Sequence, residues 1–87
     1  MNLFDILKEI LVEKKGDLYD HPEFDKAFNV WMIARYLSMR ESLLPFAQFI
    51  NQFGSTLSKK NLYLFLVKII PKQRSSFIRY MKKKKED

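Results

Sequence analysis

Apolar residues recur at helical spacing in one segment after another of this 87-residue chain. In the first segment the apolar side chains fall on one face of a helix, while Asp5, Lys8 and Glu9 fall on the other. That apolar face comprises Leu3, Phe4, Ile6, Leu7, Ile10 and Leu11. Because the chain has only two glycines, it has little room for long flexible connections. We therefore predict an all-α fold, a compact bundle of four to five short helices.

Start and stop signals divide the chain into the expected helices. Gly16 ends the first helix, and Pro22 opens a second one that ends near Leu37. One stripe of this second helix consists of Phe24, Ala27, Phe28, Trp31, Met32 and Arg35.

The third helix has two possible starts. Ser38 and Glu41 have the spacing of a capping box, but a helix beginning there would carry Pro45 in its interior. Either that helix kinks at Pro45, or a short turn precedes a helix that begins near Leu43. We favour the second start, with Gly54 as the stop signal and Phe46, Phe49, Ile50 and Phe53 as the apolar face.

The remaining signals predict two further helices. Ser58 is the expected N-cap of a fourth helix, which ends before Pro71 and is too long and too irregular in its alternation for a strand. Its inward residues are expected to be Leu62, Phe65, Leu66, Ile69 and Ile70. Ser75 is a candidate cap for a last, basic helix that carries Phe77, Ile78, Tyr80 and Met81. We expect one helical domain over residues 1–81 and a frayed tail over residues 82–87.

Positive charge is concentrated late in the chain. Before Asn51 there are 6 Lys and Arg against 8 Asp and Glu, whereas from Asn51 onward there are 10 against 2. A near-neutral body with a cationic end is typical of proteins that bind an anionic partner, most often nucleic acid or an acidic protein surface.

Several classes of protein are disfavoured by composition. The chain has no cysteine, so it can form neither a disulfide nor a thiolate metal site, and an intracellular location is the simplest interpretation. Acidic residues interrupt the first apolar segment and no basic leader precedes it, so we expect no secretory signal. The longest apolar run, residues 62–67, is far below the roughly 18 residues of a membrane span.

Catalytic chemistry has little support. His21 is the only histidine, so a zinc site would need carboxylates for nearly all of its ligands. Gly16 and Gly54 stand alone, and no glycine-rich loop is present to hold phosphates. We therefore expect no enzyme activity, no metal and no cofactor.

Basic and aromatic residues are the better candidates for function. Cations clustered on one side of a short helix can neutralise phosphates, although a lysine-rich end can also be a solubilising tail. Trp31 with Arg35 has the composition of an interface hot spot, although we favour core packing for the indole itself. Tyr80 can stack on a base or pack on the fourth helix.

Short motifs from Phe28 onward keep a characteristic order and spacing. They are the run FNVWMIARYLSM over residues 28–39, the pairs Ile50-Asn51, Gly54-Ser55 and Leu57-Ser58, Tyr63, and Ile70-Pro71-Lys72. This order resembles the small subunit of the sliding clamp loader of T-even-like bacteriophages, in a short version. The chain departs from that family at Arg35, where many relatives have asparagine, and at Arg79-Tyr80, where a basic residue and a tryptophan often stand.

The resemblance implies a non-catalytic subunit of a phage DNA polymerase clamp loader, in the cytoplasm of the infected bacterial cell. Its partners would be the AAA+ ATPase subunits, the sliding clamp and primer-template DNA. We expect nucleic-acid or acidic-partner contacts at Lys72, Arg74, Arg79, Lys82 and Lys83, and partner packing at Trp31, Arg35, Tyr36 and Tyr80. The alternative is a stand-alone phage regulator that binds a host RNA polymerase, a nuclease or DNA through the basic helix.

Overall fold

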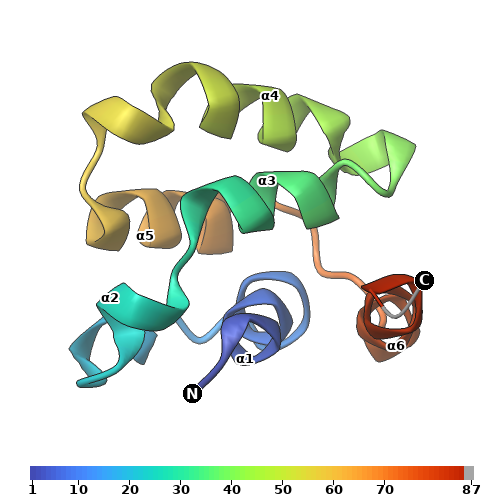
Figure 1. The fold of residues 1–87 in the computed structure, drawn as a ribbon, viewed down its shortest axis with the longest axis horizontal. Helices are drawn as coiled ribbons and strands as arrows, with labels where there is room; N and C mark the ends of the chain where they lie inside the picture. The colour runs from blue at the N-terminus through green and yellow to red at the C-terminus, as the bar shows by residue number, and fades with distance from the viewer. Residues whose placement is uncertain (86–87) are drawn as a thin grey trace.

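Helices are the regular elements of the computed structural model, which describes residues 1–85 and contains no β-strand among them (Figure 1). The α-helices are α1 (Leu3–Lys8), α2 (Phe24–Ala27), α3 (Val30–Leu37), α4 (Leu44–Phe53), α5 (Lys59–Ile69) and α6 (Ser75–Lys85). A π-helix over Glu9–Glu13 continues α1, and single 3₁₀ turns cover Leu18–Asp20, Glu41–Leu43 and Gly54–Thr56. The predicted all-α fold is confirmed, with one helix more than expected because residues 24–37 form two helices.

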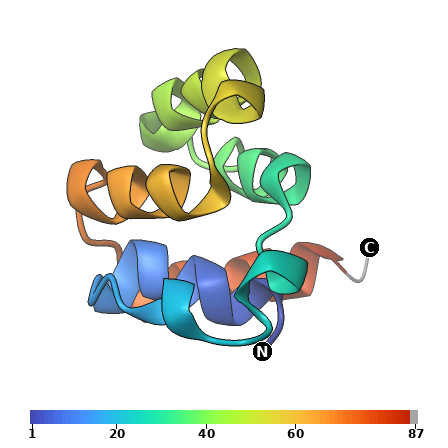
Figure 2. The same ribbon diagram turned by 90° about the vertical axis from the view of Figure 1, so that its left-hand side faces the viewer.

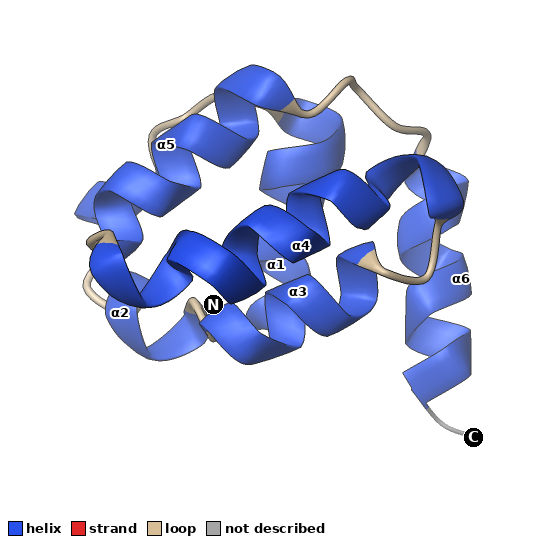
Figure 3. Ribbon diagram, turned by 90° about the horizontal axis from the view of Figure 1, so that it is seen from above, coloured by secondary structure: helices blue, strands red, loops and turns tan. Residues whose placement is uncertain are grey.

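The helices stack in three tiers, which Figures 1 and 2 show from two sides. α4 forms the upper tier, α3 and α5 the middle one, and α1, α2 and α6 the lower one. Seen from above in Figure 3, α6 lies at one end of the molecule, and it packs against α1. No helix of the described part of the chain has the length and apolar character needed to cross a membrane.

The first helix begins and ends at the expected places. Asn2 and Asp5 form a reciprocal capping box at its start, with Asp5 N donating to Asn2 Oδ1 at 3.0 Å and Asn2 N donating to Asp5 Oδ2 at 2.9 Å. At the other end Lys14 has φ 55° and Gly16 has φ 77°, so the chain passes through the left-handed region that stops a helix.

Asn29 divides the segment that we predicted as one helix. Its side-chain oxygen accepts a hydrogen bond from Met32 N at 3.1 Å and so caps α3, while Phe28 before it leaves helical geometry. The break changes the rotational phase of the helix. As a result Phe24 and Phe28 are buried, but Trp31 and Arg35 face outward, and the predicted continuous stripe is wrong. The buried residues of α3 are Ile33, Ala34, Tyr36 and Leu37.

The later of the two possible starts for the third predicted helix is confirmed. Ser38 ends α3, with its hydroxyl donating to the Arg35 carbonyl at 2.6 Å, and a 3₁₀ turn then leads into α4. Pro45 lies in the first turn of α4, where its missing N–H costs nothing. Gly54 follows the last residue of α4, as expected.

α5 and α6 complete one hydrophobic core. Ser58 caps α5 by accepting from Asn61 N at 3.1 Å. Phe65 and Ile69, which we expected to point inward, are 37% and 48% exposed, while Tyr63 is fully buried in their place. The inward residues near the end of the chain are Leu62, Leu66, Ile70, Phe77, Ile78 and Met81. α6 continues to Lys85, past the predicted domain boundary at residue 81, and Glu86 and Asp87 lie outside the described residues.

Candidate functional site

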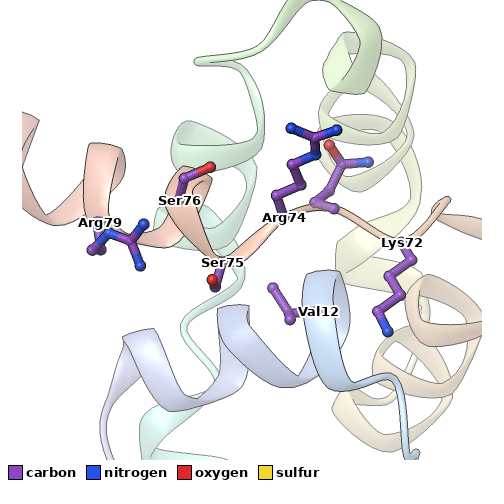
Figure 4. A pocket seen from close by; sticks show the side chains of 7 residues that line it. Val12, Lys72, Arg74, Ser75, Ser76 and Arg79 are labelled. Atoms are coloured by element: carbon purple, nitrogen blue, oxygen red, sulfur yellow. The ribbon is translucent and has the colours of Figure 1, made fainter.

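Cationic side chains surround one hollow at the start of α6. Lys72 and Arg74 come from the segment that joins α5 to α6, and Arg79 comes from α6 itself. The hollow has a volume of about 580 Å³, and Val12, Gln73, Ser75 and Ser76 complete its lining. Figure 4 shows Lys72 and Arg79 toward opposite ends of this stretch, with Val12 below it. We call these seven residues the cationic hollow.

Gln73 holds the joining segment in place. Its backbone N–H donates to the Leu11 carbonyl at 2.6 Å, which ties the segment to the end of the π-helix. Its side-chain oxygen accepts from Arg40 Nη1 at 2.7 Å, and Arg40 in turn lies 4.0 Å from the centre of the buried Phe77 ring. The residues on either side of Gln73 are exposed, so Lys72 and Arg74 extend into solvent from a fixed backbone.

No carboxylate of the described chain neutralises the cationic hollow. Residues 42–85 contain 10 Lys and Arg and not one Asp or Glu. The ion pair found within the described residues joins the amino terminus to Glu23 at 2.8 Å, and neither group lines the cationic hollow. The positive potential at this end of the molecule is therefore open to an external anion.

Lys82 and Lys83, which we also predicted as anion-binding residues, lie further along α6 and do not line the cationic hollow. Both are exposed, and Lys82 Nζ lies 5.6 Å from the centre of the Phe4 ring. Tyr80 is 45% exposed on the same helix, with Lys84 Nζ 5.8 Å from its ring centre. α6 thus carries a second, more extended group of cations beside an accessible aromatic ring.

The residues predicted to contact a protein partner are only partly together. Trp31 is 63% exposed on α3, and the Arg35 guanidinium carbon lies 5.5 Å from its ring centre. Tyr36 is buried at 3% exposure, with its ring 5.2 Å from that of Phe4. The prediction for Tyr36 is therefore corrected, because the phase of α3 turns this side chain into the core.

Two hollows meet at Trp31 along the line where α3 packs on α4. One, of about 320 Å³, is lined by Val30, Trp31, Ile50, Asn51, Gly54 and Ser55. The other, of about 160 Å³, is lined by Trp31, Ala34, Arg35, Ser38 and Asn51. Because Trp31 and Asn51 line both, the hollows are neighbours, and we call them together the α3–α4 groove.

One buried carboxylate was not predicted from the sequence. Glu9, which we placed on the polar face of the first helix, is 2% exposed. It accepts hydrogen bonds from Lys15 N at 3.2 Å, Gly16 N at 2.5 Å and the Tyr63 hydroxyl at 2.5 Å. Burial and the bond to Glu9 raise the pKa of Tyr63 above its ordinary value of 10.0. The sequence did contain one signal for this burial. Gly16 ends the helix shortly after Glu9, and the turn there provides backbone N–H groups that donate to the Glu9 carboxylate.

Nowhere between residues 1 and 85 do three or more histidine, cysteine or acidic side chains gather as they would around a metal ion. His21 is exposed, and its Nδ1 accepts a hydrogen bond from Glu23 N at 3.1 Å. This histidine therefore has a local role in the turn before α2.

Comparisons of the chain with protein-family models, with curated proteins and with solved structures gave no match.

Proposed function

We propose that the protein is a non-catalytic binding module that holds a phosphate-rich partner, nucleic acid, against the cationic hollow. One observation carries the proposal. Lys72, Arg74 and Arg79 share a single hollow, on a backbone fixed by Gln73, in a stretch without an acidic residue. Three exposed cations on a fixed backbone can contact neighbouring phosphates.

The chemistry of the cationic hollow suits a sugar-phosphate backbone. Each phosphate neutralised by a lysine or arginine releases condensed counterions, and this release drives binding without reading sequence. Ser75 and Ser76 add hydroxyl groups of the kind that donate to phosphate oxygens. We expect binding to depend mainly on backbone charge, because counterion release by the three cations acts on any sequence.

The resemblance to the small clamp loader subunit of T-even-like phages gives this binding a biological setting. In that setting the nucleic acid is primer-template DNA, and the module acts in phage DNA replication in the infected bacterial cell. Trp31 and Arg35 would then contact an AAA+ ATPase subunit or the sliding clamp. The hollows beside Trp31 and the cationic hollow share no lining residue, so the two contacts use different side chains.

The test is binding of fluorescently labelled primer-template DNA to the full chain and to two triple variants. Replacing Lys72, Arg74 and Arg79 by alanine should weaken binding at least about tenfold, because three phosphate contacts are lost. The matched control replaces Lys59, Lys60 and Lys68, which removes the same charge from exposed positions on α5. Circular dichroism checks the fold of both variants.

The control variant separates local binding from net charge. If both triple variants lose the same affinity, the cationic hollow has no special part and the proposed site is wrong. Unchanged affinity of the Lys72, Arg74 and Arg79 variant would discard the nucleic-acid function altogether.

A further inference from the structure

The exposure of Trp31 has a structural cause. Asn29 restarts the helix, and the inward positions of α3 are then filled by Ile33, Ala34 and Leu37. A tryptophan left 63% exposed forgoes much of the burial that such a large side chain can provide. Large exposed apolar groups beside arginine are characteristic of protein interfaces, where tryptophan and arginine supply most of the binding energy.

The larger hollow of the α3–α4 groove has mainly apolar walls. Gly54 is part of its lining, and a Cβ atom there would lie 3.0 Å from Val30 Cγ1 and 3.3 Å from Ile50 Cγ2. Because glycine has no Cβ, Val30 of α3 and Ile50 of α4 can pack closely around this position. At about 320 Å³ the hollow is at the lower limit for small-molecule sites, a size better suited to one side chain than to a cofactor.

The smaller hollow has a different chemistry. Arg35 lines it together with Ser38, and the guanidinium is exposed beside the Trp31 ring. Among residues 1–85 no carboxylate lies within ion-pair distance of Arg35. A planar guanidinium in this position is suited to a carboxylate, which it can hold by two parallel hydrogen bonds.

We infer that the α3–α4 groove binds a short linear segment of a partner protein that carries a large apolar side chain close to an aspartate or glutamate. The apolar side chain enters the hollow between Val30, Ile50 and Gly54, and the carboxylate pairs with Arg35 on the other side of Trp31. Charge complementarity selects this occupant, since the groove has one free cation and no acidic lining residue. The inference rests on the protein-binding part of the proposed function and not on its nucleic-acid part.

The experiment selects short random peptides displayed on phage against the full chain. Enriched peptides should share a leucine or aromatic residue and an acidic residue at constant spacing. Affinity of the consensus peptide is then measured for variants by fluorescence anisotropy. Trp31→Ala and Arg35→Gln should each weaken binding at least about tenfold.

Two control variants test whether the loss of peptide binding is specific to the groove. Phe53→Ala removes an exposed aromatic ring, and Lys68→Gln removes an exposed cation, both outside the groove. These two variants should bind the peptide as the unchanged chain does. Circular dichroism establishes that Trp31→Ala remains folded, as its exposure leads us to expect.

Several outcomes would overturn the inference. They are a failure to enrich peptides, a consensus without an acidic residue, and peptide binding that survives Trp31→Ala. Self-association in sedimentation that disappears in Trp31→Ala would identify a second copy of the chain as the occupant instead. DNA binding is measured on the same variants. Loss of DNA binding in the Lys72, Arg74 and Arg79 variant with intact peptide binding separates the two functions.

Discussion

Glu9 is the least expected single residue in this protein. Its carboxylate is buried, and its hydrogen-bond donors are two backbone N–H groups and one phenol. Charge-assisted hydrogen bonds of this kind offset the cost of removing a carboxylate from water. The Tyr63 hydroxyl also accepts from Leu18 N at 3.1 Å, so one phenol connects the first helix, the following loop and α5.

Removing that phenol should destabilise the fold. Tyr63→Phe leaves Glu9 with one donor fewer and Leu18 N–H without its acceptor, and we expect a loss of about 1–3 kcal/mol in the free energy of unfolding. Urea denaturation measures it. Tyr80→Phe is the control, because that side chain is 45% exposed and should change stability little. Equal midpoints for the two variants would contradict a structural role for the Tyr63 hydroxyl.

The same residue makes stability sensitive to alkaline pH. The pKa of Tyr63 is raised in the folded state, mainly by burial and then by the bond to Glu9. Its contribution is therefore complete below the ordinary tyrosine pKa of 10.0 and is lost as pH rises through the higher folded value. We expect the free energy of unfolding to fall above pH 10.0, and to fall less in Tyr63→Phe. Urea midpoints across this range that run parallel in both proteins would oppose the assignment.

At the scale of elements, Asn29 determines which surface α3 presents. Replacing it by alanine removes the acceptor for Met32 N, and we expect a loss of about 1 kcal/mol in stability. Asn29→Asp should retain most of it, because aspartate caps a helix equally well. Asn61→Ala is the control, an exposed asparagine inside α5 whose side chain caps no helix. Thermal unfolding compares the variants, and an Asn29→Ala protein as stable as the control would show that the cap contributes nothing.

Local signals predicted helix ends better than helix faces. Ser58 and Pro45 act through their immediate neighbours, so their caps and first turns were recognisable in the sequence. The break at Asn29 also has a local cause, but an asparagine within an apolar segment is a weak signal. Once that break is missed, the faces of Trp31 and Tyr36 are exchanged, because each residue along a helix turns the side chain by more than a quarter of a circle.

The same contrast between local and tertiary causes applies to the candidate site. Lys72, Arg74 and Arg79 are close in sequence, so a shared location was predictable. Val12 lines the hollow and Gln73 bonds to Leu11 only because of tertiary packing, so neither feature could be predicted from the local sequence. Phe65 was expected in the core because α5 is apolar on most sides. Its ring instead stacks on that of Phe49 near the surface, with the two ring centres 4.6 Å apart.

For the whole molecule, the separation of charge predicts how binding responds to salt. The 10 Lys and Arg of residues 42–85 have no acidic residue among them. If duplex DNA is the partner, the logarithm of affinity should fall linearly with the logarithm of salt, with a slope of about −0.9 for each phosphate neutralised. The Lys72, Arg74 and Arg79 triple variant should have a shallower slope. Titrations at several salt concentrations measure both slopes, and an affinity that salt does not change would exclude a phosphate partner.

The packing of α6 on α1 links the two ends of the described chain. Phe77 and Met81 of α6 are buried, and Lys82 lies over Phe4 of α1. During translation, α1 leaves the ribosome long before α6 has been synthesised. The part of α1 that α6 covers therefore stays exposed until the end of the chain is made, and a nascent chain halted before Ser75 would present that part to chaperones or proteases.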